Sequence, residues 1–467
     1  MKMKTILMSS LALITYSLNA QIDASLESVV LNRYNIINSS NQLSLNVKNN
    51  GNSAISSLTV NWNDGTNHSQ LISASIAAGA SATVNHPTMV SYNSIVEKNI
   101  TVTIVNVNNA SDPVTSNNSK TIAFNTVSEV PHKNVVLEEA TGTWCINCPG
   151  GVYYIEDVIM PQVPNNFIPI SIHHGGNDPM EISNYFSYTG LVAYPTGNLN
   201  RKIKDVTAGN GWGDGFNILI DQVAPALIEA TVTNNGQNVT INTSTNFYTN
   251  FSSANFRLAA VITEDHVTGT TSGYNQANTY SGNANVPFFG SQPNPVPASQ
   301  MVYNYVARAL LNDAYNGMAG SIPTTISDGT IVDYTFNYTV PSESNIDSMY
   351  AVIMLIDQTT GEIVNSSKFP IKAISTSNAG IDKTDLMRLT IYPNPAVDLM
   401  TISFEGNDSE HTIKVLDLTG KMIYTKTIAG INGVQNFQFP VSTIDAGTYL
   451  LSVESEGKKT IEQIIIK

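Results

Sequence analysis

The chain has 467 residues, of which 42% are hydrophobic and only 12% are charged. This hydrophobic content is enough to build buried cores, so a globally disordered chain is excluded. The formal net charge of −14 argues against partners that need a basic face, so we expect no binding to nucleic acid or to anionic membrane surfaces.

The N-terminal residues have the pattern of a secretory signal peptide. Lys2 and Lys4 are followed by a short apolar stretch over 6–16 and by a small-residue cleavage site at 18–20. An N-terminal helix buried in a folded domain is the alternative. We therefore expect 1–20 to direct export, and because no later stretch is apolar over about 18 residues, we expect no transmembrane segment.

Residues 21–128 alternate apolar and polar side chains in several short runs, such as 43–47 and 100–105. Asn- and Gly-rich turns at 49–52 and 63–66 separate these runs, since Asn and Gly tolerate positive φ. Short alternating strands between such turns predict an antiparallel β-sandwich.

The order of features in this segment resembles bacterial adhesion-related immunoglobulin-like modules. The features are Val-Lys-Asn-Asn-Gly at 47–51, Ala-Ala-Gly-Ala-Ser at 77–81, and a turn from Asp112 to the Ser-Asn-Asn of 116–118. The resemblance implies an immunoglobulin-like fold. Such a domain either takes part in adhesion or is a spacer that binds no ligand.

Residues 129–224 change to an alternation of strands and helices. The expected strands cover 134–138 and 167–172 and begin again at 194, and the expected helices cover 149–160, 180–191 and 212–224. This pattern predicts an α/β domain.

Residues 225–372 return to alternating apolar and polar residues, which predict a second β-sandwich with one short helix near 302–311. The stretch 273–300 is rich in Gly, Asn, Ser and Pro, so we expect an exposed loop. Residues 373–388 are expected to form a linker.

Residues 389–467 form a small all-β unit by the same alternation. They contain Tyr-Pro-Asn-Pro at 392–395, Asp-Leu-Thr-Gly-Lys at 417–421, Gly-Thr-Tyr at 447–449 and a terminal strand. This order resembles the C-terminal sorting domain of type IX secretion in Bacteroidetes-type bacteria. The resemblance implies handling by the type IX machinery, passage across the outer membrane, and release or surface attachment. An ordinary terminal sandwich is the alternative.

Cys145 and Cys148 are the only two cysteines, and they lie between a predicted strand and a predicted helix. A zinc site would need four ligands, and the nearest imidazoles, His173 and His174, are neighbours that would point to opposite faces of a strand. We therefore expect no metal and no cofactor. A structural disulfide and a redox-active dithiol both remain, because a disulfide across so short a loop stabilises little, whereas a cysteine at a helix N-terminus favours the thiolate. His173 and His174 either line the cysteine cleft or belong to a solvated loop.

Residues 133–224 resemble a thioredoxin-like domain, through Trp144-Cys-X-X-Cys and the later Tyr-Pro-Thr at 194–196. The resemblance implies a catalytic set: Cys145 as the attacking thiolate and Cys148 as the resolving thiol, able to form a disulfide. It further implies a cis Pro195 that shapes the substrate groove, and Glu139, turned inward, as a proton relay. Its neighbour Glu138 is expected to face outward, since adjacent strand residues point to opposite faces.

The run Glu-Glu-Ala-Thr-Gly-Thr-Trp-Cys at 138–145, joined to a following β domain, resembles the Omp28-related outer membrane proteins over about 130–370. That family implies an exported surface protein. Two functions follow from the sequence: a secreted or outer-membrane-surface thiol–disulfide oxidoreductase acting on an unidentified protein, or a non-catalytic surface adhesin whose disulfide is structural.

Overall fold

The computed structural model describes residues 22–372 and 389–467, except for positions 393, 397–398, 407, 418–419, 431–432, 443 and 457. The predicted signal peptide and the predicted linker lie outside the described residues. The chain divides into two compact units, Met1–Ala373 and Ile374–Lys467, both built mainly of strands. The predicted fold class, a mainly β multidomain protein, is confirmed.

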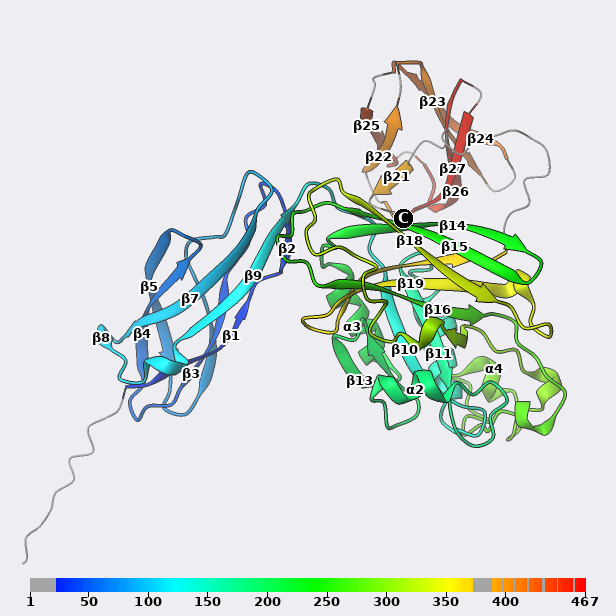
Figure 1. Ribbon diagram of the computed structural model, residues 1–467, viewed down its shortest axis with the longest axis horizontal. Helices are drawn as coiled ribbons and strands as arrows, with labels where there is room; N and C mark the ends of the chain where they lie inside the picture. The colour runs from blue at the N-terminus through cyan, green and yellow to red at the C-terminus, as the bar shows by residue number, and fades with distance from the viewer. Residues whose placement is uncertain are drawn as a thin grey trace, which may run out of the picture. The chain divides into compact units, whose positions relative to one another are not determined.

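The N-terminal part is a β-sandwich (Figure 1, blue to cyan). One sheet has the order β1-β3-β6 and the other β2-β9-β7-β4-β5, with β8 paired to β7. Alternate residues of the strands are buried between the two sheets, as in β3, so the period of two drives their pairing. The strands are β1 Ala24–Val30, β2 Tyr34–Ile36, β3 Ser44–Asn49, β4 Ile55–Asn63, β5 Asn67–Ile76, β6 Ser81–Asn85, β7 Glu97–Val107, β8 Ala110–Ser111 and β9 Ser119–Val127, with the 3₁₀ helix η1 Thr115–Asn117.

The centre of the first unit is one eight-stranded sheet with the order β13-β12-β10-β11-β17-β16-β19-β20 (Figure 1). The central strand β10 runs parallel to β11 and antiparallel to β12, and β11 runs parallel to β17. The strands are β10 Val135–Thr141, β11 Phe167–His173, β12 Thr196–Leu199, β13 Ile203–Thr207, β16 Phe256–Glu264, β17 Val306–Leu310, β19 Met349–Asp357 and β20 Ile363–Pro370.

This sheet corrects two expectations for residues 225–372. Residues 306–310, expected within a helix, form strand β17, which pairs with both β11 and β16. The expected second sandwich does not stand apart, because four of its strands continue the sheet that holds the cysteine motif. A sheet of β14 Ala226–Asn235, β15 Asn238–Phe247 and β18 Ile331–Thr339 packs on one face of β16 and β19. The domain boundary at 224 stays a prediction.

The three helices expected within residues 129–224 are present and cover the two faces of β10. Helix α1 Pro149–Tyr153 continues as a π-helix, η2 Tyr154–Ile159, and packs with α3 Asn210–Ile220 on one face. Helix α2 Ser183–Thr189 packs on the other. The remaining short helices are η3 Ser272–Tyr274, α4 Pro287–Gly290, η4 Ala298–Gln300, η5 Leu311–Asp313 and η6 Ile346–Ser348. Every residue of β10 is therefore buried.

The second unit is a small β-sandwich with its own core. Its sheets have the orders β21-β22-β25 and β24-β23-β26-β27. The strands are β21 Leu389–Tyr392, β22 Leu399–Gly406, β23 His411–Asp417, β24 Met422–Ile428, β25 Gly433–Pro440, β26 Gly447–Ser455 and β27 Lys458–Ile466.

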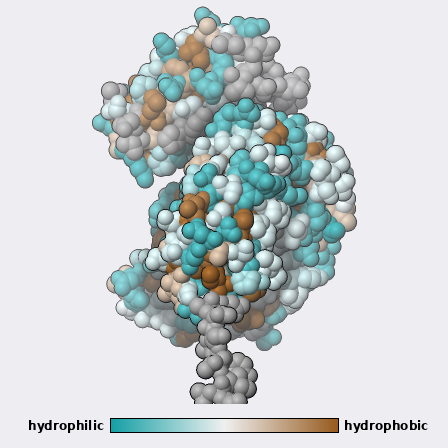
Figure 2. Space-filling view, turned by 90° about the vertical axis from the view of Figure 1, so that its left-hand side faces the viewer, coloured by the Kyte–Doolittle hydropathy of each residue, from teal (hydrophilic) through white to brown (hydrophobic). Residues whose placement is uncertain are grey.

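The molecular face drawn in Figure 2 is mostly hydrophilic or neutral and carries small, separate hydrophobic patches. Within the described part of the chain, no helix combines the length and apolarity required to cross a membrane.

Candidate functional site

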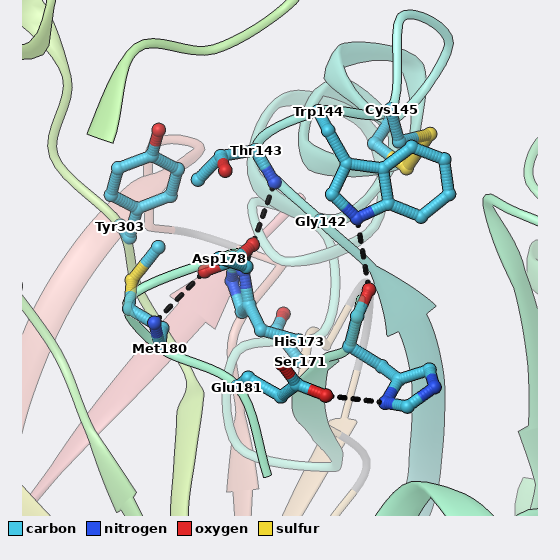
Figure 3. A network of polar contacts seen from close by, with 12 residues as sticks. Gly142, Thr143, Trp144, Cys145, Ser171, His173, Asp178, Met180, Glu181 and Tyr303 are labelled. Atoms are coloured by element: carbon cyan, nitrogen blue, oxygen red, sulfur yellow. Dashed lines mark hydrogen bonds and ion pairs between the residues drawn. A yellow bond between two sulfur atoms is a disulfide. The ribbon is translucent and has the colours of Figure 1, made fainter. Parts of the chain in front are cut away.

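The two cysteines form a disulfide in the turn between β10 and α1. The backbone N–H of Cys145 donates to the carbonyl of Gly142 at 3.1 Å, and that of Cys148 donates to the carbonyl of Cys145 at 3.3 Å. Both cysteines are buried, with exposed fractions of 5% and 1%, whereas the neighbouring Trp144 is 44% exposed. The disulfide therefore lies just beneath the surface, beside an exposed aromatic ring (Figure 3).

Helix α1 begins one residue after the second cysteine. Cys148 is the N-cap and Pro149 takes the first helical position, where its missing N–H leaves no hydrogen bond unmade. The helix thus starts at 149, as the sequence predicts, and both cysteines precede it, because proline favours the first turn of a helix and not its interior.

Pro195 lies against the first turn of α1, and the Tyr194–Pro195 peptide bond is cis. A Cβ atom on Gly151 would come within 3.2 Å of the Pro195 Cβ and would overlap the Glu139 carboxyl group. Only glycine lets the helix approach both side chains this closely. The structure thus brings all four predicted site residues, the two cysteines, Glu139 and Pro195, to the start of α1.

Glu139 is buried on β10, as expected, with an incompletely bonded carboxyl group. Its Oε2 accepts from the Ser171 hydroxyl at 3.0 Å, and its Oε1 has no hydrogen-bond partner among the described residues. Burial raises the pKa of Glu139 to about 8; the nearby Glu156 adds to this rise and the Ser171 hydrogen bond opposes it. The group is therefore mostly protonated at neutral pH.

Glu138 is also buried, which corrects the expectation that it faces solvent. Both faces of β10 are covered, so alternation moves the side chain into a second core and not into water. Arg201 donates to both carboxylate oxygens at 2.7–3.1 Å, and the Tyr185 hydroxyl donates at 2.8 Å. The Arg201 guanidinium also lies 3.5 Å from the centre of the Tyr315 ring. Glu138 is a satisfied structural group.

Asp178 holds the backbone just before the cysteines, a role that is not predictable from the sequence. Its carboxylate accepts from the N–H of Thr143 at 2.7 Å and from that of Met180 at 2.9 Å, and it lies 2.8 Å from Nδ1 of His173 (Figure 3). Burial favours a higher pKa, but the His173 hydrogen bond and charge outweigh it and lower the pKa of Asp178. No spacing signal links Asp178 to the cysteines, because the contact depends on where the loop after β11 folds back.

His173 and His174 have different environments. His173 is buried behind the motif and lies edge-on to Tyr303 at 5.7 Å. His174 accepts at its carbonyl from the Trp144 indole N–H at 2.9 Å, and its ring stacks on Phe186 at 4.1 Å. Both histidines therefore lie next to the cysteine loop, His173 through Asp178 and His174 through Trp144.

The stretch 273–300, expected to be an exposed loop, instead covers the cysteine motif; we call it the cap. The N–H groups of Ala277 and Thr279 donate to the carbonyls of Thr143 and Ile146 at 2.8 and 2.9 Å, and the Gln276 amide donates to the Cys145 carbonyl at 3.0 Å. Val286, Phe289 and Val296 are buried in a cluster that includes residues of α1. These three apolar residues were the signal in the sequence that the stretch is buried, but its high content of polar residues outweighed them.

Comparisons with known proteins support the expected location of the protein outside the cell or at its surface. Residues 182–374 match the family model described as outer membrane protein Omp28, and residues 390–467 match the secretion system C-terminal sorting domain. The protein is therefore secreted or held at the outer-membrane surface. The Omp28 match begins later than the expected 130, so it includes Pro195 but neither cysteine.

Two solved structures share low similarity with the chain. HBP35 of Porphyromonas gingivalis is 16% identical, with a TM-score of 0.39, and the match covers 72% of this chain and 99% of that chain. The CARDB domain of the PF1109 protein from Pyrococcus furiosus is 17% identical, with a TM-score of 0.21, over 24% of this chain and 97% of that chain. These TM-scores are too low to support a conclusion about fold or function. No curated protein matches the chain.

Proposed function

We propose that the protein is a surface thiol–disulfide oxidoreductase, and that residues 129–224 form a thioredoxin-like domain whose Cys145–Cys148 pair exchanges disulfides with another protein. The observation that carries the proposal is the buried Glu139 carboxyl group behind α1. Gly151, which contacts it, lies three residues after Cys148 and thus on the same side of the helix. A titratable group with a raised pKa beside a cysteine pair is typical of a reactive site.

The proposed exchange starts from the oxidised pair. A substrate thiolate attacks Sγ of Cys145, so a mixed disulfide forms and Cys148 leaves as a thiolate. Glu139, protonated at neutral pH because of its raised pKa, gives its proton to Cys148. A second substrate thiolate then attacks the substrate sulfur of the mixed disulfide and releases Cys145. The substrate dithiol is thereby oxidised to a disulfide and the protein pair is reduced; the reverse sequence reduces a substrate disulfide.

Pro195 would border the surface that receives the substrate. Its neighbour Tyr194 packs edge-on against the exposed Trp144 at 5.1 Å, so the two rings frame one side of the cysteine turn. An extended substrate segment lying there would meet backbone at Pro195 and aromatic surface at Trp144.

The second candidate is a non-catalytic surface protein with a structural disulfide. The low exposure of Cys145 and the hydrogen bonds from the cap favour it, because a sulfur that is covered cannot be attacked. In this case the disulfide anchors the cap and α1 to each other.

Insulin reduction by dithiothreitol, catalysed by the full chain, separates the two candidates. The oxidoreductase requires that wild type accelerate the reaction and that Cys145→Ser abolish the acceleration. Cys148→Ser should accumulate a mixed disulfide through Cys145, because the resolving thiol is gone. Equal rates for wild type and Cys145→Ser would support the structural role instead.

A further inference from the structure

A cavity of about 350 Å³ lies between the N-terminal sandwich and the eight-stranded sheet. Lys133, in its wall, lies just before the start of β10, whereas Cys145 follows the end of that strand. A strand of this length spans roughly 20 Å, so the cavity is separate from the disulfide site. Ligand pockets commonly measure about 300–1,000 Å³ and often lie where domains meet.

Specific contacts hold the walls of this cavity together. Arg33 of the sandwich forms an ion pair with Asp357 at the end of β19, and Asn125 donates to the carbonyl of Asn250 at 3.0 Å. Tyr34 and Val127 of the sandwich are buried in the same core as the sheet of β14, β15 and β18. The cavity is therefore part of a packed junction.

The charged groups in the wall are unequal in number. Arg33, Lys133 and Lys202 face only two carboxylates, Asp357 and Glu362. Arg33 pairs with Asp357, and Lys202 lies 3.2 Å from Glu362. The wall of this cavity thus holds three basic and two acidic side chains, although the chain as a whole has a net charge of −14.

Of the three basic residues in this wall, Lys133 is the one that has no carboxylate of the described residues at hydrogen-bond distance. Its Nζ donates to the backbone carbonyl of Val364. Burial lowers the pKa of Lys133 to about 7, with the charge of Lys202 adding to the effect and that of Glu362 opposing it. In the same wall, the buried Nε of Arg33 has no hydrogen-bond partner among the described residues. Buried cations and donors are ordinarily paired.

We propose that this cavity binds a small polar molecule through one anionic group, a carboxylate or a phosphate, held by Lys133 and Arg33. An anion there would favour the charged form of Lys133 and would lie beside the Arg33 guanidinium. Side chains of Asn32, Gln222 and Thr360, which also line the cavity, offer hydrogen bonds to the hydroxyl groups of a sugar-sized ligand.

Calorimetric titration of the full chain with three related probes tests the proposal. D-glucuronate and D-glucose 6-phosphate carry the two anionic groups on one sugar, and D-glucose carries neither. We expect at least one anionic probe to bind roughly tenfold or more tightly than glucose, since a charge-assisted hydrogen bond contributes at least that factor. The probe that binds more tightly shows whether the site prefers a carboxylate or a phosphate.

Variants locate the binding. Lys133→Met should lower the affinity for the anionic probe by about tenfold or more. Lys204 is an exposed residue on β13, so Lys204→Met should leave the affinity unchanged. Glu362→Gln should raise the affinity for the anionic probe, because it removes a competing carboxylate. This variant keeps the test valid if Lys133→Met fails to fold. The proposal is overturned when no anionic probe binds more tightly than glucose, or when Lys133→Met and Lys204→Met bind equally well.

Discussion

Glu138 and Glu139 are neighbours on one strand, yet their carboxyl groups lie in different surroundings. Glu138 meets a guanidinium and two tyrosines, whereas Glu139 meets one hydroxyl group and a glycine. The first environment stabilises the charge, and the second raises the pKa through burial. The sequence could predict that Glu139 points inward, but not that Glu138 is buried too, because its partner Arg201 comes from a distant turn.

Removal of the guanidinium should destabilise the fold. Arg201→Met leaves Glu138 as an uncompensated buried charge, so we expect the free energy of unfolding to fall by about 3–5 kcal/mol. Urea denaturation measures this loss. Lys204→Met, on the same sheet edge but exposed, is the control and should change stability little. Adding Glu138→Gln to Arg201→Met should recover part of the loss; a double variant no more stable than the single one would contradict the pairing.

Glu139 should make stability depend on pH. Its folded pKa of about 8 lies above the ordinary 4.5, so the folded state holds a proton that the unfolded state loses in this interval. The contribution to stability is complete below about pH 4.5 and is lost as the pH rises to about 8, by at most about 1.4 kcal/mol per pH unit. Comparing Glu139→Gln with wild type at pH 5 and pH 8 isolates this loss: the variant should gain relative stability at pH 8. An equal difference at both pH values would refute the raised pKa.

The elements around the cysteines were predictable where the signal was local. The period of apolar residues predicts the strand before Cys145, the helix after Cys148 and helix α3. The cap and strand β17 were not, because each is defined by a partner far away in the chain: β17 by Ser171 of β11, and the cap by the backbone of Thr143 and Ile146. Periodicity carries no information about such pairings.

Loosening the cap should expose the disulfide. Phe289 is 2% exposed and helps to anchor the cap, whereas its neighbour Phe288 is 44% exposed. Phe289→Ala should cost about 3–5 kcal/mol of packing and raise the rate of disulfide reduction by dithiothreitol roughly tenfold or more. Phe288→Ala is the matched control and should react like wild type. Equal rates for both variants would mean that the cap does not limit access.

At the scale of the whole molecule, the sorting domain and the first unit carry separate tasks. The C-terminal sandwich has its own core, and its match to the secretion system sorting domain implies handling by the type IX machinery. Chains that lack 389–467 should therefore fold in their first unit but accumulate in the periplasm of a type IX-secreting bacterium. Fractionation with an antibody to the first unit measures this, with the full-length chain as control. Surface display of the truncated chain would contradict the assignment.

Strand β17 also sets an order of events during biogenesis. It lies between β11 and β16, yet it is made long after β11 as the chain is synthesised. The half of the sheet that carries the cysteines must therefore wait, incomplete, until Val306–Leu310 has emerged. Such distant pairing slows folding, so the part of the sheet that carries the cysteines stays incomplete for longer in the oxidising periplasm.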